Sequence, residues 1–135
     1  MQSAYFFCIS VEFLLGFNPI IYMNENKTMF TYGTLIDNGI RSRVLGKETM
    51  SYPAELKDYE LTIHSYCPFL TIKKSVGSVV KGIIFEVNEN DLKRLDQYEN
   101  GLYDRIVVNV EVNYKSDYDC YTYIEKPEER YILSN

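Results

Sequence analysis

The sequence predicts an α+β domain, with a mixed, mostly antiparallel, barrel-like β-sheet and one or two flanking helices. Two observations favour this class: many short β-prone runs with two helical segments between them, and no regular strand–helix alternation that would build a doubly wound sheet. At 135 residues with 46% hydrophobic residues, the chain is long enough for one domain with a core. We expect that domain at residues 29–135, ending in a polar tail.

The first half of the domain contains β-prone runs separated by glycine and proline. Residues 29–32 form such a run, Gly33 ends it, and a turn signal and a short helix follow. Residues 59–64 and 69–73 are the next two runs. Pro68 lies between them and cannot donate a ladder hydrogen bond, so a hairpin or a meander is expected there.

The second half combines alternating strands with one well-marked helix. Residues 77–78 predict a turn, and residues 82–87 alternate as a strand buried mainly on one side. Asn88 is a typical helix N-cap, and the helix is expected to run from about residue 89 to 98 or 99. Two further strands are expected, at residues 106–112 and 120–124.

Composition and charge exclude some classes of partner. A net charge of −5 and a pI near 4.9 argue against nucleic acid, whose binding needs a concentrated basic surface. The nearest approach to a basic cluster, Arg41, Arg43 and Lys47, is explained by a solvated helix face. Three widely spaced cysteines are typical of reduced intracellular thiols, so we expect a cytoplasmic protein.

Residues 1–28 differ from the rest and are interpreted as an apolar extension outside the functional core. Residues 4–23 are largely apolar, but Glu12 lies near the middle of this stretch and Pro19 interrupts it. A central acid costs a membrane helix about 2.5–3.5 kcal/mol, so no membrane span is expected, and an N-terminal membrane anchor is the less favoured alternative. The stretch also lacks the positive segment and cleavage site of a secretory signal.

The familiar nucleotide-binding, serine-hydrolase and zinc-protease motifs are absent from the sequence. His64, the only histidine, lies three residues before Cys67, so the two residues could form a nucleophile pair or half of a metal site. Nothing supplies the remaining ligands or an orienting acid. A half-exposed strand histidine and a structural thiol are the better interpretation, and no metal site is expected.

Glu99 is the most informative residue, because the predicted helix places an acid where an apolar residue is expected. It follows Leu95 by four residues and Leu92 by seven, which puts it on the helix face that packs on the core. Position alone leaves two interpretations open. Glu99 is either solvated or paired with Arg105, or it is a general base whose pKa is raised by desolvation and the helix C-terminus.

The loop at Tyr32, Gly33, Thr34 and Leu35 is the second candidate feature. A glycine directly after a strand lets a ligand approach the backbone, whose free N–H groups can bind a carboxylate or an oxyanion. An ordinary turn explains the tetrapeptide equally well. By itself it carries no functional conclusion.

Taken together, these segments resemble the gamma-glutamylcyclotransferase family, in particular its small branch of gamma-glutamylamine cyclotransferases, also called avirulence-induced-gene-like proteins. The order and spacing fit from Met29 to about Ile124. The segments that carry the resemblance are Tyr-Gly-Thr-Leu at 32–35, Cys-Pro-Phe-Leu at 67–70, residues 82–87, Leu-Asp-Gln-Tyr-Glu at 95–99, Tyr103 with Arg105, and residues 120–124.

The resemblance implies a barrel whose pocket brings the loop and a catalytic acid/base, Glu99, together. Substrate-binding residues implied are Tyr32, Gly33, Thr34 and Leu35, through backbone groups, with Tyr103 and Tyr123 as pocket walls. The implied partner is a small gamma-glutamyl amine or peptide, which is converted to 5-oxoproline and a free amine without a metal or other cofactor. Arg105 is expected to fix the loop after the helix.

Two features of the sequence qualify these implications. Cys67 stands where the family usually has an aromatic residue, and Ser42-Arg43 replaces a commonly polar amide region; both departures concern substrate choice more than the base. An alternative to catalysis is a binding module that uses the same pocket for a small ligand or a partner protein without turnover.

Overall fold

The computed structural model describes residues 27–113 and 117–127. The predicted apolar extension, as far as residue 26, and the predicted tail beyond residue 127 lie outside these ranges. Within them, no helix has the length and apolar character needed to cross a membrane.

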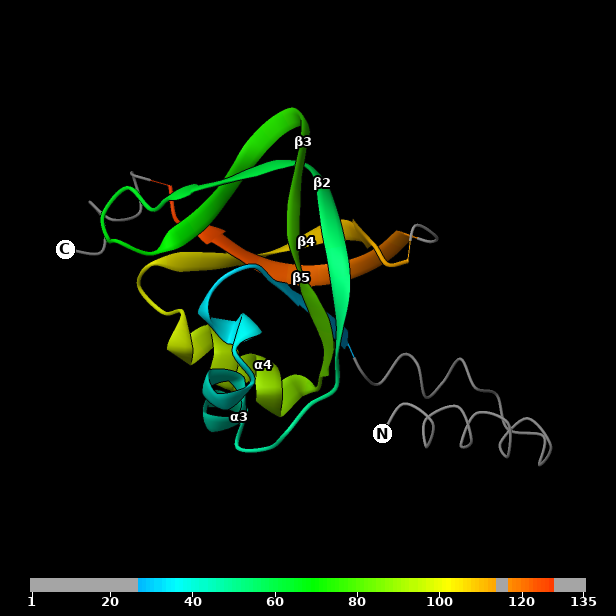
Figure 1. The fold of residues 1–135 in the computed structure, drawn as a ribbon. Helices are drawn as coiled ribbons and strands as arrows, with labels where there is room; N and C mark the ends of the chain where they lie inside the picture. Colours follow the sequence, from blue (N-terminus) through cyan, green and yellow to red (C-terminus); the bar gives the residue numbers. More distant parts are fainter. Residues whose placement is uncertain (1–26, 114–116, 128–135) are drawn as a thin grey trace.

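A closed barrel of five strands forms the described part of the chain, in the order β1-β3-β2-β4-β5, and helices lie along one side of it (Figure 1). This confirms the predicted mixed, mostly antiparallel sheet with flanking helices. The elements are β1 (Lys27–Thr31), η1 (Thr34–Ile36), α3 (Asn38–Leu45), β2 (Ser51–Ile63), β3 (Leu70–Val87), α4 (Glu89–Tyr98), β4 (Tyr103–Glu111) and β5 (Asp117–Glu125).

Strand β1 closes the barrel by pairing with strands from both halves of the chain. It runs antiparallel to β3 and parallel to β5, where Met29 faces Tyr121. The other pairs among the described strands are antiparallel. The Thr122 hydroxyl donates a buried hydrogen bond of 2.8 Å to the Phe30 carbonyl, which joins β5 to β1 beside the pairing. The end of β1 is therefore fixed next to β5.

Alternate residues of β1 and β3 point into two separate cores. Phe30, Tyr32 and Ile84 belong to the core inside the barrel, whereas Met29 and Phe85 belong to the core beneath the helices. Residues 82–87 were expected to be buried mainly on one side. That expectation is wrong at Ile84, which is 8% exposed, because closure of the barrel covers the second face as well. The helices contribute three buried leucines to the second core, Leu45, Leu92 and Leu95.

The hairpin of β2 and β3 is longer than predicted, although its connection lies near Pro68 as expected. Strand β2 begins at Ser51, and β3 continues through residues 77–78, so the turn expected there is wrong. The register of the β2–β3 pairing shifts between Lys57 and Tyr59. At this shift Asp58 and Gly77 have positive φ angles of 65° and 87°, and the Gly77 N–H donates to Asp58 Oδ1 at 2.9 Å. Gly77 therefore lies at a β-bulge and not at a turn. Both structures can require a positive φ angle, which glycine adopts readily.

Helix α4 begins and ends where the sequence predicts. The Asn88 side chain accepts from the Asp91 N–H at 2.8 Å, and the Asp91 carboxylate accepts from the Asn88 N–H at 2.9 Å, which makes a capping box. Asp91 also binds Lys47 at 2.9 Å, and the Arg94 guanidinium donates to the Leu45 carbonyl. These contacts fix α4 against α3 and thereby fix the direction of its C-terminal end.

Gly82 provides a test of this packing, because β3 crosses β1 closely at that residue. A Cβ atom at Gly82 would lie 2.2 Å from the Thr31 carbonyl oxygen and 2.8 Å from the Phe30 ring. We expect Gly82→Ala to lower the free energy of unfolding by about 1–3 kcal/mol, measured by urea denaturation. Val76→Ala, at a position of the same strand that is 95% exposed, should change it by less than about 0.5 kcal/mol. Equal stability of Gly82→Ala and the parent protein would contradict the close approach.

Candidate functional site

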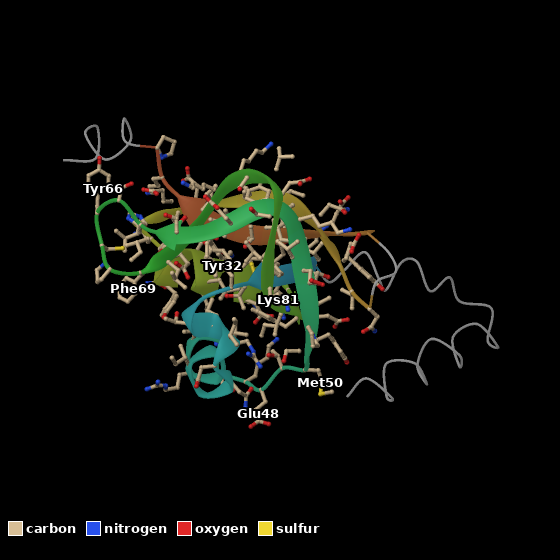
Figure 2. The ribbon with its side chains drawn as sticks, turned by 45° about the horizontal axis from the view of Figure 1, so that its top comes forward. Tyr32, Glu48, Met50, Tyr66, Phe69 and Lys81 are labelled. Atoms are coloured by element: carbon tan, nitrogen blue, oxygen red, sulfur yellow. The ribbon has the colours of Figure 1, made fainter. Side chains whose placement is uncertain are left out.

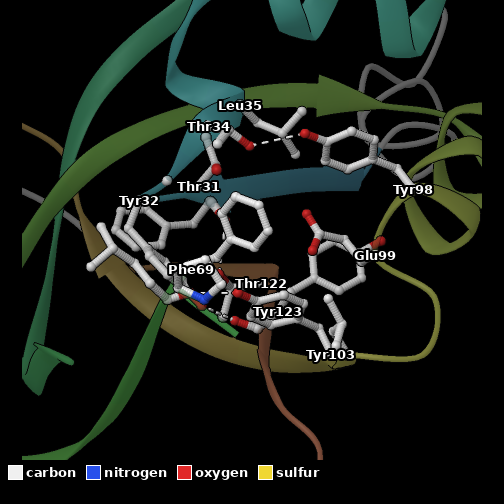
Figure 3. Close-up of a pocket in the computed structure, with 15 residues that line it drawn as sticks. Thr31, Tyr32, Thr34, Leu35, Phe69, Tyr98, Glu99, Tyr103, Thr122 and Tyr123 are labelled. Atoms are coloured by element: carbon white, nitrogen blue, oxygen red, sulfur yellow. Dashed lines mark hydrogen bonds between the residues drawn. The ribbon is translucent and has the colours of Figure 1, made fainter. Parts of the chain in front are cut away.

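A cavity of about 620 Å³ opens between the end of β1, the β2–β3 connection and the C-terminal end of α4 (Figure 3). Its walls come from segments that are far apart in the sequence. All seven residues that the sequence analysis singled out as site residues line it: Tyr32, Gly33, Thr34, Leu35, Glu99, Tyr103 and Tyr123.

The cavity also contains residues that the sequence analysis did not assign to a site. Five of them lie in segments that carried the family resemblance, so their motifs were the available signal: Pro68, Phe69, Leu70, Tyr98 and Thr122. The other three gave no such signal, because they reach the cavity only after the barrel closes: Phe30, Thr31 and Leu102.

The glycine loop leaves β1 and turns at once into η1. The Gly33 carbonyl accepts from the Ile36 N–H at 3.1 Å. Apart from Gly33 and its two chain neighbours, no atom of the described residues lies within 4 Å of the place where a Gly33 side chain would begin. The backbone beside Gly33 is therefore open to a ligand. The first N–H groups of a helical turn also have no partner within the turn.

Arg41 supports this loop from the protein interior. It is 3% exposed, and one guanidinium nitrogen donates to the carbonyls of Leu35 and Ile36 at 3.0 and 3.1 Å. The other two nitrogens bind Thr49 Oγ1 at 2.9 Å and Asn38 Oδ1 at 3.0 Å. The expected solvated helix face is therefore wrong for Arg41, and burial lowers the pKa of its guanidinium. The sequence analysis missed this supporting role.

Glu99 directly follows α4, and its side chain lies inside the cavity between Tyr98 and Tyr103, across from Tyr32 (Figure 3). Its backbone N–H donates to the Leu95 carbonyl at 2.9 Å, and its carbonyl accepts from the Tyr103 N–H at 3.2 Å. Burial raises the pKa of the Glu99 carboxyl from 4.5 to about 7. A group with this pKa can both accept and donate a proton near neutral pH.

The alternative interpretation in which Glu99 pairs with Arg105 is wrong. Arg105 Nε instead lies 3.2 Å from Asp96 Oδ1, and the guanidinium lies over the Tyr121 ring at 4.6 Å from its centre. Arg105 thus joins the last turn of α4 to the barrel. The carboxylate of Glu99 faces the cavity instead.

The tyrosine hydroxyls of the cavity are held by specific partners. Tyr32 donates to the Tyr123 carbonyl at 2.5 Å, Tyr123 donates to Asp96 Oδ1 at 2.7 Å, and Tyr103 donates to the Leu70 carbonyl at 2.6 Å. Burial raises the pKa of both Tyr32 and Tyr123. Both phenols therefore stay protonated at neutral pH, and Glu99 is the group of this cavity that titrates there.

His64 has a structural role, as expected, but it is buried and not half-exposed. Its Nε2 lies 2.9 Å from the Leu102 carbonyl, and its Nδ1 accepts from the Tyr66 N–H at 3.0 Å, an arrangement that places the proton on Nε2. It joins the β2–β3 connection to the loop after α4. Cys67 is a free, partly buried thiol, and the described residues contain no cluster of three or more potential metal ligands.

Comparison with known proteins agrees with this architecture. A solution structure from Arabidopsis thaliana matches 81% of this chain and 74% of its own at 20% identity, with a TM-score of 0.66. The match to a gamma-glutamyl cyclotransferase covers 76% of this chain and 68% of that protein, at 22% identity and with a TM-score of 0.67. The match to an AIG2-like protein from Mus musculus covers 78% of this chain and 82% of that protein, at 22% identity and with a TM-score of 0.62. These likenesses show the fold.

A search of curated proteins gave no match. The sequence model of the family described as "Gamma-glutamyl cyclotransferase, AIG2-like" matches residues 29–134, which is most of the chain. The protein therefore belongs to the AIG2-like gamma-glutamyl cyclotransferase family.

Proposed function

We propose that the protein is a cyclotransferase that converts a gamma-glutamyl amine or peptide to 5-oxoproline and a free amine, with Glu99 as general acid and base. The family and the fold support cyclotransferase-like activity. The observation that carries the assignment to Glu99 is its partly buried carboxyl, with a pKa of about 7, in the same cavity as the glycine loop.

The reaction needs little from the protein, because the substrate contains its own nucleophile. The α-amine attacks the side-chain carbonyl carbon, a new C–N bond closes the five-membered lactam, and the bond to the leaving amine breaks. The α-ammonium nitrogen loses two protons as it becomes the lactam N–H. The Glu99 carboxylate takes them in turn and returns them to the leaving nitrogen, which departs as an ammonium group. No water is consumed, and Glu99 ends the cycle in its starting state.

In this proposal the loop at residues 32–35 binds the glutamyl end through its backbone N–H groups. Such donors suit both the α-carboxylate and the oxyanion that develops on the attacked carbonyl. Tyr103 and Tyr123 form walls that keep the amine close to the carbonyl. Arg41 holds the carbonyls of Leu35 and Ile36, so the loop is positioned before substrate binds.

Glu99→Gln tests the proton-transfer role. Because the amide cannot accept the proton, we expect release of 5-oxoproline from a panel of gamma-glutamyl compounds to fall at least about 100-fold. In the parent protein, kcat/KM should rise with pH and level off above an apparent pKa near 7. Glu89→Gln, at an exposed position of the same helix, should keep full activity.

Equal turnover by Glu99→Gln, or a flat pH profile from 5.5 to 8.5 in the parent protein, would contradict the assignment. Stabilisation by a gamma-glutamyl compound without any product would identify a binding module.

The same substitution tests the buried charge through stability. The folded protein keeps a proton on Glu99 between pH 4.5 and about 7 that the unfolded chain releases, so stability falls as pH rises through this window. A glutamine at this position does not titrate, so the variant does not lose stability in this pH window. We expect Glu99→Gln to be more stable than the parent by about 1–3 kcal/mol at pH 8 and equally stable at pH 4, by urea denaturation. A variant no more stable at pH 8 would show that the carboxylate is solvated.

Arg41→Lys tests the support of the loop. Lysine keeps the charge but cannot form the four hydrogen bonds of the guanidinium, so we expect about 1–3 kcal/mol less stability. At a temperature where the variant is folded, kcat/KM should still fall about tenfold, because the loop donors lose their fixed position. Arg43→Lys, exposed on the same helix, is the matched control. Identical behaviour of the two variants would refute the role.

A further inference from the structure

We propose that this cavity selects gamma-glutamyl compounds whose leaving amine carries an apolar ring and no carboxylate. The proposal rests on the cyclotransferase function proposed above and extends it to the class of substrate. Three observations support it: the division of the cavity into a buried floor and an exposed rim, the fixed geometry of that rim, and the distribution of charge around it.

The residues that line the cavity include a buried group and an exposed group, with others of intermediate exposure between them. The floor is formed by side chains that are at most 8% exposed, among them Tyr32, Leu35 and Tyr123. The rim is formed by exposed apolar and aromatic residues, Phe69 (53%), Tyr98 (46%) and Leu70 (41%), together with Pro68. A gamma-glutamyl group held at the loop and Glu99 leaves its amine substituent at this rim.

The rim is held in place before any ligand binds. The Leu70 carbonyl accepts from the Tyr103 hydroxyl at 2.6 Å, and the Tyr98 hydroxyl lies 3.1 Å from Thr34 Oγ1 (Figure 3). Phe69 lies on the β2–β3 connection at one end of the molecule (Figure 2). Covering preorganised apolar surface is favourable in proportion to the area removed from water, and a flat ring matches the aromatic faces at this site.

The charge around the cavity disfavours a leaving group with a carboxylate. None of the described residues that line the cavity is Lys, Arg or His. The nearby Arg105 is engaged by Asp96 and the Tyr121 ring. Burial is the main cause of the raised pKa of Tyr32, and the negative charges of Glu99 and Glu125 add to it, so these carboxylates make the electrostatic potential at the floor more negative. The glutamyl carboxylate can use the loop N–H groups, but a second carboxylate finds no cation here.

Three probes, tested with the full-length protein, distinguish the effect of the ring from the effect of the carboxylate. The first is gamma-glutamylphenethylamine. Gamma-glutamylphenylalanine adds only the carboxylate to it, and gamma-glutamylethylamine lacks only the ring. We expect kcat/KM for 5-oxoproline release to be at least tenfold higher for the phenethylamine compound than for either of the others. Phe69→Ala should reduce the preference for phenethylamine over ethylamine at least fivefold. Val76→Ala, exposed on the same hairpin but outside the cavity, should keep it.

A preference for the phenylalanine compound, equal rates with all three probes, or an unchanged preference in Phe69→Ala would overturn the proposal. If neither the three probes nor the panel of gamma-glutamyl compounds yields 5-oxoproline, the proposed function fails, and the rim is then tested by binding alone. Greater thermal stabilisation by the phenethylamine compound than by the other two would support the ring-binding rim. Equal stabilisation by all three would overturn it.

Discussion

The parallel pairing of β1 with β5 is the constraint on which the rest of the site depends. It places Met29 beside Tyr121, and two hydrogen bonds extend it, from Thr122 to the Phe30 carbonyl and from Tyr32 to the Tyr123 carbonyl. Because β1 ends in the glycine loop, this pairing brings the loop, Tyr123 and the end of α4 to the same opening of the barrel. Without this pairing, the candidate residues, which lie on separate segments of the sequence, would not meet at one opening.

Helix α4 supplies the other half of the geometry. Its capping box fixes where it begins, its contacts with α3 fix its direction, and the burial of Leu92 and Leu95 fixes its rotation. Glu99 follows this buried stripe, so the packing that stabilises the helix also places a carboxylate in a cavity that removes it from water. The resulting rise in pKa costs stability at neutral pH, as is common where a group is prepared for proton transfer.

Much of this arrangement could be predicted from the sequence, because local signals coincide with the tertiary structure. The alternation of residues 106–112, the Asn88 cap and the position of Glu99 after Leu92 and Leu95 are such signals. Other features depend on contacts that have no local pattern. The bulge at Gly77 has the composition of a turn, and Arg41 is buried because it binds backbone carbonyls, which no sequence motif displays.

The central claim is that the fold holds Glu99 as a desolvated carboxyl ready to exchange a proton near neutral pH. The most direct test is an NMR titration of its side-chain carboxyl carbon in the full-length protein, with the signal assigned by its loss in Glu99→Gln. The account predicts a midpoint near pH 7. A midpoint near the ordinary glutamate value of 4.5 would contradict it.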